Sequence, residues 1–248
     1  MEDPVRRAVE RSLAAMRENL AESLTVDDLA RSAMFSKFHY SRLFRRTTGV
    51  SPAQFLAALR LTEAKRLLLT TGGSVADISH QVGYNSVGTF STRFTTSVGA
   101  APTVYRRSGG RVPGVLDEDG GGDRGVASTV RGQLTVPRAA GPVFIGVFPG
   151  RITEGKPARC ALLTGPGTYA LSAVPEGTWH VVAHAATAPG TDGPDRFVGH
   201  AGPLTTRPGV AASIADLRLR PAGVFDPPVL LALPDLRAQL PSNVAKPA

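Results

Sequence analysis

The spacing of the apolar residues changes from helical to strand-like near residue 108, and this change limits the fold more than any other feature of the chain. Up to that point apolar residues recur every three or four positions, which is the period of an amphipathic helix. The first such stripe comprises Val5, Val9, Leu13, Met16 and Leu20. Beyond it, short apolar segments alternate with Pro and Gly, as strands do. We therefore expect a multidomain chain with an all-α domain first and a small all-β, sandwich-like domain second.

Three segments follow from this change. Residues 1–107 form the expected helical domain. Residues 108–128 are rich in glycine, include an acidic run and have no periodic apolar face, which is typical of a flexible linker. Residues 129–248 form the expected β-rich domain. Its strands are expected at 130–136, 143–148, 159–163, 168–174, 179–185 and 213–219.

The helical segment contains a short helix, a turn and a longer capped helix at residues 24–48. Thr25 is the expected N-cap of the short helix. Two aspartates follow it in the first turn, where carboxylates are stabilised by the positive end of the helix dipole. A turn at Met34-Phe35 then leads to a helix over 37–48, with Ser36 as its N-cap. Such a unit is a helix-turn-helix, whose second helix enters the major groove of DNA.

The same design returns further along the chain. Ser74 is the expected cap of a short helix, residues 82–84 form the turn, and Asn85 or Ser86 caps a helix that ends near Ser97. Two such units in one segment predict two recognition helices.

The apolar pattern of residues 51–70 predicts a helix between the two units. A helix of about 20 residues, rising about 1.5 Å per residue, spans about 30 Å. This length is close to the roughly 34 Å between successive major-groove faces. One chain can therefore engage two adjacent turns of DNA.

The net charge of +8 is concentrated in the helical part. Residues 1–108 carry 15 Lys and Arg against 9 Asp and Glu, whereas residues 109–248 carry 13 against 11. A basic domain favours a polyanionic partner, because release of condensed counterions drives nucleic-acid binding. Charge by itself does not identify that partner as DNA.

No apolar run approaches the roughly 18 residues that a bilayer span needs, and the acidic N-terminus is unlike a signal peptide. We therefore expect a cytoplasmic protein with no membrane partner. Cys160 is the single cysteine, which excludes an internal disulfide and a multi-cysteine zinc site. We expect it to be a buried structural residue rather than a nucleophile.

A series of short motifs runs in order through the helical segment. They are Ser36 with Arg42-Leu43-Phe44-Arg45-Arg46 and Gly49-Val50-Ser51-Pro52, then Phe55-Leu56 with Arg60-Leu61, Ala64 and Leu67-Leu68, then Val82-Gly83-Tyr84, Phe90-Ser91 with Phe94, and Pro102 with Tyr105-Arg106-Arg107. Together they resemble the DNA-binding domain of the AraC/XylS family of transcriptional regulators over about residues 4–107. The resemblance implies double-stranded promoter DNA and RNA polymerase as partners, and we expect no cofactor, metal site or catalytic site. The family usually has its sensing domain first, so the order here is a departure.

The first recognition helix has a basic outer side. Its residues expected at DNA are Lys37, Phe38, Ser41, Arg42, Arg45 and Arg46. The resemblance places Phe38, Ser41 and Arg42 at base edges, where Arg42 can fork onto guanine and Phe38 can touch a thymine methyl. The remaining basic residues are better placed for phosphates. The alternative is a solvated basic face.

The second recognition helix departs from the family pattern. Thr92 and Thr95 stand where basic residues are usual, and Gly88 replaces a longer polar side chain. Its residues expected at DNA are Ser86, Val87, Thr89 and Arg93. We expect the first helix to dominate specificity, while the second reads DNA shape and thymine methyls or is purely structural. Met34 replaces a glycine that is frequent in the first turn, and we expect that turn not to demand positive φ.

The β-rich segment weakly resembles the transthyretin-like sandwich modules of carboxypeptidase regulatory domains. The match rests on residues 155–158, 167–171 and 174–181. Such modules usually bind or scaffold. Trp179 and Tyr169 are expected in the core, with the lining of a small-molecule pocket as the alternative.

Three histidines in this segment raise the question of a metal site. Residues 180 and 184 of one strand lie about 13 Å apart, which is too far for both to bind one ion. We therefore expect His180, His184 and His200 to be surface residues.

The sequence predicts a sequence-specific DNA-binding transcriptional regulator, not an enzyme, that inserts two recognition helices into adjacent major-groove segments of promoter DNA. Its β domain then binds a small-molecule effector or a protein partner, or dimerises. Two alternatives stay open: a non-specific architectural DNA binder, and a DNA-directed enzyme with a catalytic C-terminal domain. No paired carboxylates, phosphate loop or nucleophile–base spacing supports the enzyme.

Overall fold

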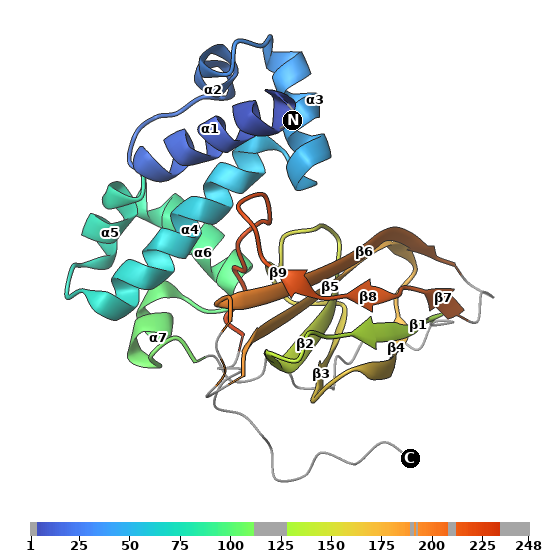
Figure 1. Ribbon diagram of the computed structural model, residues 1–248. Helices are drawn as coiled ribbons and strands as arrows, with labels where there is room; N and C mark the ends of the chain where they lie inside the picture. The colour runs from blue at the N-terminus through green and yellow to red at the C-terminus, as the bar shows by residue number, and fades with distance from the viewer. Residues whose placement is uncertain (1–3, 112–127, 189–190, 192, 208–211, 234–248) are drawn as a thin grey trace. The chain divides into compact units, whose positions relative to one another are not determined.

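The computed structural model describes residues 4–111, 128–188, 191, 193–207 and 212–233. Its contacts divide the chain into two compact units. The helical unit comprises residues 1–112 with 223–232, and the β unit comprises residues 113–222 with 233–248. A helical region therefore comes first and a β-rich region with two sheets follows, as the apolar spacing predicts (Figure 1). Most of the expected linker, residues 112–127, lies outside the described residues.

The helical unit begins with two helix-turn-helix arrangements joined by one long helix. Its helices are α1 (Pro4–Glu18), α2 (Val26–Ser32), α3 (Lys37–Thr48), α4 (Pro52–Thr70), α5 (Val75–Gln81), α6 (Val87–Val98) and α7 (Pro102–Arg107). Among the described residues no helix is both long enough and apolar enough to cross a membrane. The expected first helix, the two short helices and the two longer capped helices are all present.

Capping boxes begin both short helices at the predicted residues. Thr25 Oγ1 accepts a hydrogen bond from Asp28 N at 3.1 Å, and Ser74 Oγ accepts one from Asp77 N at 3.1 Å. The hydroxyl and backbone N–H of each cap residue donate to the aspartate in return. These hydrogen bonds, with the side-chain bond as the larger cause, lower the pKa of Asp28 and of Asp77, because they stabilise the charged carboxylate.

The caps of the two longer helices differ in detail from the prediction. Ser36 has the extended backbone of an N-cap, but its side chain makes no capping hydrogen bond. Ser86 Oγ accepts a hydrogen bond from Thr89 N at 3.3 Å, so Ser86 rather than Asn85 caps α6. The second helix-turn-helix therefore begins its outer helix with a satisfied cap and the first does not.

The long helix α4 runs between the group α1–α3 and the group α5–α7 (Figure 1). It starts at Pro52, where the missing N–H costs nothing, after a capping box of Ser51 and Gln54. Phe55 is fully buried and packs edge-on against Phe44 of α3, with ring centroids 5.7 Å apart. The 19 residues of α4 give it a length of about 28 Å.

One segment beyond the last strand belongs to the helical unit. The apolar pattern predicts that all of residues 129–248 belong to the β-rich domain, whereas the contacts group Gly223–Ala232 with the helices. Leu230 and Leu231 of this segment are 0% and 2% exposed, and Ala232 N donates to Val98 O at 3.0 Å. Burial of these leucines is the physical reason for the difference. We call Gly223–Ala232 the strap.

The β unit contains two sheets. Its strands are β1 (Ser128–Thr135), β2 (Ala140–Phe148), β3 (Arg159–Leu163), β4 (Gly167–Val174), β5 (Gly177–Thr187), β6 (Arg196–Thr206), β7 (Ala212–Ile214), β8 (Leu217–Arg218) and β9 (Arg220–Pro221). In one sheet β1 pairs antiparallel with β4 and parallel with β7 and β8. The other sheet is antiparallel, in the order β3-β2-β5-β6-β9. One core cluster contains side chains from both sheets, including Leu171 from the first and Val181 from the second.

Two features of the β unit differ from the predicted strands. The apolar pattern does not predict β6, because Gly199 and Gly202 interrupt it. Gly202 is needed where it stands, because its φ is +113° and a Cβ there would lie 2.9 Å from Trp179 O, whereas a Cβ on Gly199 would approach only Leu219 Cδ1, at 3.0 Å. The strand predicted at 213–219 is split into β7 and β8, and Asp216 between them accepts a hydrogen bond from Gln133 N at 2.8 Å.

Candidate nucleic-acid interface

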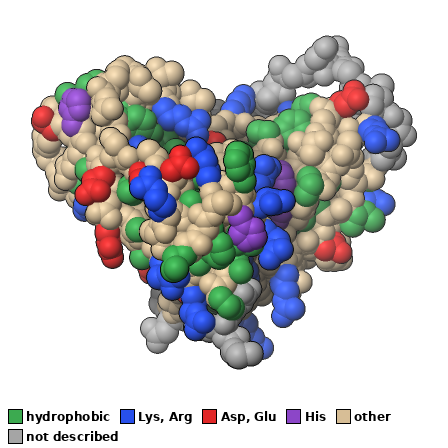
Figure 2. Space-filling view, turned by 90° about the horizontal axis from the view of Figure 1, so that it is seen from above, with side chains coloured by type: hydrophobic (Ala, Val, Ile, Leu, Met, Phe, Trp, Pro, Cys, Tyr) green, Lys and Arg blue, Asp and Glu red, His purple; other side chains and the backbone are tan. Residues whose placement is uncertain are grey.

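The helix α3 has one buried side and one exposed side. Its buried residues are Tyr40, Leu43, Phe44 and Thr48. Its exposed basic residues are Lys37, Arg42, Arg45 and Arg46. Phe38 stands among them with 83% of its surface exposed, and Ser41 is half-buried beside them. Figure 2 shows Lys and Arg side chains (blue) and hydrophobic side chains (green) exposed on the face that it draws.

The predicted basic residues of α3 are not equivalent. Lys37 Nζ lies 2.8 Å from Asp27 Oδ2 of α2, in an ion pair that the sequence analysis did not predict. An anion would have to compete with this carboxylate. Within the described part of the chain, no ion-pair partner is found for Arg42, Arg45 or Arg46. These three arginines are therefore the groups of α3 best placed to meet a polyanion.

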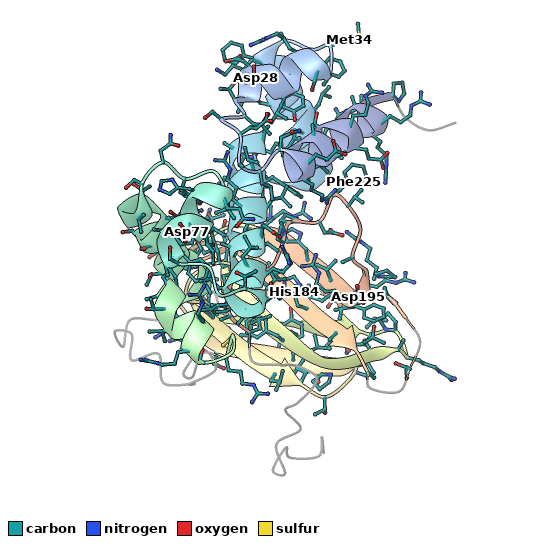
Figure 3. The ribbon with its side chains drawn as sticks, turned by 90° about the vertical axis from the view of Figure 1, so that its left-hand side faces the viewer. Asp28, Met34, Asp77, His184, Asp195 and Phe225 are labelled. Atoms are coloured by element: carbon teal, nitrogen blue, oxygen red, sulfur yellow. The ribbon has the colours of Figure 1, made fainter. Side chains whose placement is uncertain are left out.

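The turn before α3 is strained, contrary to the sequence expectation. Met34 has a φ of 60°, in the left-handed region that costs a residue with a Cβ about 1–2 kcal/mol. Its side chain is 90% exposed and points away from the helices (Figure 3). The expectation that this turn needs no positive φ is therefore wrong. At this exposure, contacts of the Met34 side chain with the described residues offset little of the strain.

The turn before α6 has glycine at the equivalent place. Gly83 has a φ of +83°, and a Cβ there would overlap Leu20 O and lie 2.9 Å from Arg60 Cζ. Arg60 Nε and Nη2 donate to Leu20 O at 3.0 Å and Glu22 O at 2.6 Å, which fixes the guanidinium against this turn. Burial lowers the pKa of Arg60, the largest effect on that group. Gly83 is thus required both by backbone conformation and by close packing.

The helix α6 presents far less charge than α3. Of its predicted residues, Thr89 is exposed, Val87 and Arg93 are half-buried, and the Ser86 side chain is used as the cap. A shallow depression of about 440 Å³ follows its outer side. It is lined by Gly88, Thr89, Thr92, Arg93 and Thr96. Thr96 is not among the residues predicted from the sequence, because a threonine in a helix carries no distinctive signal.

The two outer helices can be compared position by position. Their caps Ser36 and Ser86 correspond, and so do the fully buried Phe44 and Phe94. The exposed arginines of α3 and their counterparts on α6 are Arg42 and Thr92, Arg45 and Thr95, and Arg46 and Thr96. Three cationic positions of the first helix are therefore neutral hydroxyls in the second.

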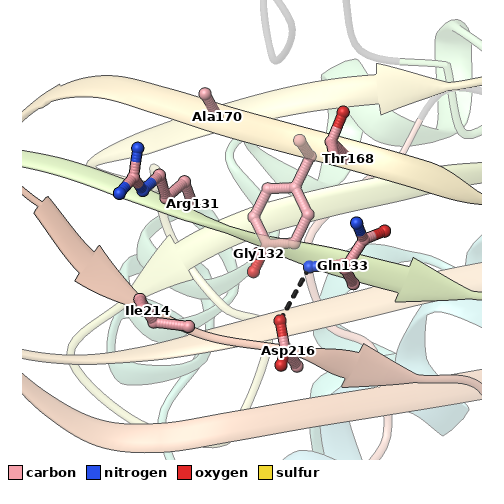
Figure 4. A pocket seen from close by; sticks show the side chains of 8 residues that line it. Arg131, Gly132, Gln133, Thr168, Ala170, Ile214 and Asp216 are labelled. Atoms are coloured by element: carbon pink, nitrogen blue, oxygen red, sulfur yellow. Dashed lines mark hydrogen bonds between the residues drawn. The ribbon is translucent and has the colours of Figure 1, made fainter.

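A separate groove of about 620 Å³ lies on the β1–β4 sheet of the β unit. Figure 4 shows Arg131 and Ile214 at one end and Gln133 and Thr168 at the other. Ile214 is 73% exposed, although it is a large apolar residue. Tyr169, whose hydroxyl donates to Ala215 O, is 5% exposed and belongs to the core, as predicted, and it also lies along the groove.

The histidines and the cysteine of the β unit depart from their predicted environments. His184 is 3% exposed, and its Nε2 lies 2.6 Å from Thr153 Oγ1, so it is not a surface residue. His180 Nδ1 and His200 Nε2 lie 2.8 Å apart with stacked rings, because the two residues come from neighbouring strands. Cys160 is half-buried rather than buried. Burial is the main cause that lowers the pKa of His200 to about 4.

No three His, Cys, Asp or Glu side chains among the described residues are close enough together to hold a metal ion.

Part of the helical unit matches a known family of protein domains. Residues 29–108 match the family HTH_18, described as a helix-turn-helix domain. The match begins inside α2 and ends just after α7, so it covers both turns and both outer helices. This segment carries an AraC-type helix-turn-helix domain, as the motifs of the sequence predict.

The curated relatives match the same part of the chain. A lactose operon transcription activator of Staphylococcus xylosus is 33% identical over 93 residues, which is 38% of this chain and 33% of that protein. The transcriptional activator AarP of Providencia stuartii is 33% identical over 76 residues, which is 31% of this chain and 56% of that protein. The chain thus spans about a third to just over half of the length of these relatives.

Solved structures with similarity also cover the helical part. One is the DNA-binding domain of AdpA, solved in complex with a target DNA. The alignment has 33% identity and a TM-score of 0.39, and it covers 43% of this chain and 93% of the AdpA chain. An AraC-type regulator from Chromobacterium violaceum is 28% identical and covers 44% of this chain and 96% of that chain, with a TM-score of 0.41.

Proposed function

We propose that this protein is a transcriptional regulator that binds promoter DNA sequence-specifically through its helical unit. The observation that carries the proposal is the outer side of α3, where Arg42, Arg45 and Arg46 are exposed beside Phe38 and have no ion-pair partner among the described residues. A cationic surface of this kind on the second helix of a helix-turn-helix fits the major groove. The AraC-type domain of residues 29–108 supports the same reading.

The two outer helices have unequal roles in this proposal. Arg42 forks onto guanine and Phe38 contacts a thymine methyl, while Arg45 and Arg46 bind phosphates. Lys37 contributes less, because its ammonium group is already paired with Asp27. On α6, Thr89 and Arg93 follow the groove, and Val87 offers a methyl contact. The first helix supplies most of the specificity.

A selection of bound fragments from random-sequence DNA by the full-length protein tests the proposal. The expected result is one enriched motif that extends over two adjacent helical turns. Arg42→Ala should keep salt-sensitive binding and lose preference at one base position. Thr92→Ala is the matched control on α6 and should leave the motif unchanged. Salt-sensitive binding with no enriched motif would instead identify a non-specific architectural binder.

We propose a binding role for the β unit, which we interpret as a small β-sandwich that shares one core between its two sheets. The groove lined by Arg131, Gln133 and Ile214 is the candidate site for an effector with an anionic group and an apolar body. Arg131 would pair with the anion and Ile214 would cover the apolar part. A thermal-shift screen of small carboxylic acids tests this role: a stabilising hit should lose its effect in Arg131→Ala. If every stabilising acid still stabilises Arg131→Ala, the groove is not the binding site.

The proposed function implies RNA polymerase as a protein partner. Transcription from a promoter containing the selected motif, with and without the protein, tests this partner and also shows whether the protein activates or represses.

A further inference from the structure

The strap contacts three parts of the helical unit that are far apart in sequence. At its start, Arg17 Nη2 of α1 donates to Val224 O at 3.3 Å. Arg6 of α1 lies with its Cζ 4.6 Å from the centroid of the Phe225 ring. Figure 3 shows Phe225 at the tip of the loop that approaches α1. Asp226 closes this tip, because its carboxylate accepts a hydrogen bond from Gly223 N at 2.7 Å.

The middle of the strap is held by the long helix. Lys65 Nζ of α4 donates to Val229 O at 3.2 Å and to Leu230 O at 3.0 Å. The same ammonium group lies 5.9 Å from the centroid of the Tyr105 ring of α7. Lys65 thereby directs its charge into the helical unit rather than into solvent. It is a half-buried lysine whose partners are backbone carbonyls of a distant segment.

The end of the strap reaches the second helix-turn-helix. Ala232 N donates to Val98 O, the last residue of α6, at 3.0 Å. Leu231 Cδ1 lies 3.5 Å from the place where a Cβ on Gly99 would stand. Leu230, Leu231 and Ala232 are each 2% exposed or less. The strap is therefore packed tightly at the end of α6, and it connects this end with α1.

We propose that the strap is a positioning element that fixes the two helix-turn-helix arrangements relative to each other, with Lys65 and Leu231 as its principal contacts. The inference deepens the proposed function and rests on it, because the distance between α3 and α6 sets the spacing of the two DNA segments that one chain can engage. Helix α4 alone joins the two arrangements along one side. The strap adds a second connection that runs from α1 across α4 to the end of α6.

The first arm of the test measures this positioning without DNA. Spin labels at Arg45→Cys on α3 and Thr96→Cys on α6, in full-length protein carrying Cys160→Ser, report the distance between the two outer helices. Both label sites are exposed. Lys65→Met and Leu231→Ala should broaden or shift the distance distribution. Arg66→Met, on the neighbouring residue that pairs with Glu63 and not with the strap, is the control and should leave it unchanged.

Folding is checked for every variant by circular dichroism. Arg17→Met changes only an exposed contact at the α1 end of the strap, so it keeps the measurement informative if a buried variant does not fold. Folded strap variants with the distance distribution of the unmodified strap would overturn the inference, whatever the DNA results are.

The second arm measures the effect on DNA. The selected motif is prepared with one, two and three additional base pairs between its halves. The protein with an intact strap should lose about two- to threefold in affinity on insertion, because the weaker contacts of the second helix can no longer form. The strap variants should lose less than half of that factor, with unchanged affinity for the first half-site alone. An equal loss in all variants would overturn the inference, whereas absence of any motif would contradict the proposed function only.

Discussion

The two helix-turn-helix arrangements of this chain share a frame and differ in the residues that the frame presents. Both short helices start with a Ser or Thr capping box closed by an aspartate. Both outer helices bury an aromatic pair, Tyr40 with Phe44 in α3 and Phe90 with Phe94 in α6. Their outer sides diverge, because the arginines of α3 correspond to threonines in α6.

The difference teaches that the side chains that fold each helix are separate from the side chains that each helix presents to solvent. Burial and capping determine each helix, and they use the side chains that face inward. The outward positions are free of these folding requirements, and there the first arrangement carries Arg42, Arg45 and Arg46 whereas the second carries threonines. The second arrangement, however, has the better fold locally, with a side-chain cap on Ser86 and a glycine at its turn.

The largest expected effect comes from the turn of the second arrangement. Gly83→Ala adds a Cβ that overlaps Leu20 O in a backbone conformation with positive φ. We expect the helical unit to lose more than about 3 kcal/mol of stability, since strain and overlap add. Thermal unfolding of the full chain measures this loss, and Gly88→Ala, in more open space, is the control. A loss below about 1 kcal/mol in Gly83→Ala would show that the turn can relax.

The next effect concerns recognition. Arg42→Ala should weaken binding to the selected site by about 1–3 kcal/mol while binding to random DNA changes less. Thr92→Ala, at the counterpart position, should change binding by less than about 0.5 kcal/mol. Fluorescence titration with both DNAs measures the two variants. Equal losses for both variants would show that α6 reads bases as strongly as α3.

A smaller effect concerns the strained turn of the first arrangement. Met34→Gly removes the cost of a left-handed residue with a Cβ but adds chain entropy to the unfolded state. We expect a net stabilisation of about 0.5 kcal/mol, seen as a rise of about 2–4 °C in the melting temperature. A fall in melting temperature would mean that the exposed Met34 side chain stabilises the folded protein by more than its backbone strain costs.

The smallest effect concerns the capping boxes, in which the two arrangements should behave alike. Asp28 and Asp77 have a lower pKa in the folded protein than the ordinary value of 3.8. Folding therefore favours the charged carboxylates, and their stabilisation is present above pH 3.8 and is lost as the pH falls through the folded pKa. Asp28→Asn and Asp77→Asn should each flatten the acid limb of stability slightly and equally. An effect confined to one variant would show that one cap is not formed in solution.

Much of the helical unit could be predicted from local sequence, because caps and helical periods are short-range signals. The start of α2 after Thr25, the start of α5 after Ser74 and the whole extent of α3 are examples. The positive φ of Met34 could not be predicted, since its side chain gives no sign of the backbone that the neighbouring helices impose.

Features that depend on contacts between residues far apart in the sequence could not be predicted from local sequence patterns. The strap is a short, mostly apolar segment without helical or strand period, and its partners, such as Lys65 and Val98, are more than 100 residues away in sequence. Strand β6 depends on glycines that fit against other strands. In the candidate interface, the type and exposure of the arginines follow from helix geometry, whereas the pairing of Lys37 with Asp27 needs the relative placement of two helices.

The central claim, that α3 supplies the specificity and α6 little of it, is tested most directly by single base-pair substitutions through the selected site. The half-site that loses its preference in Arg42→Ala is the half that α3 contacts. We expect losses of about 1–3 kcal/mol in binding at positions in that half and less than about 0.5 kcal/mol at positions in the other half. Equal losses in both halves, or random DNA bound as tightly as the selected site, would contradict it.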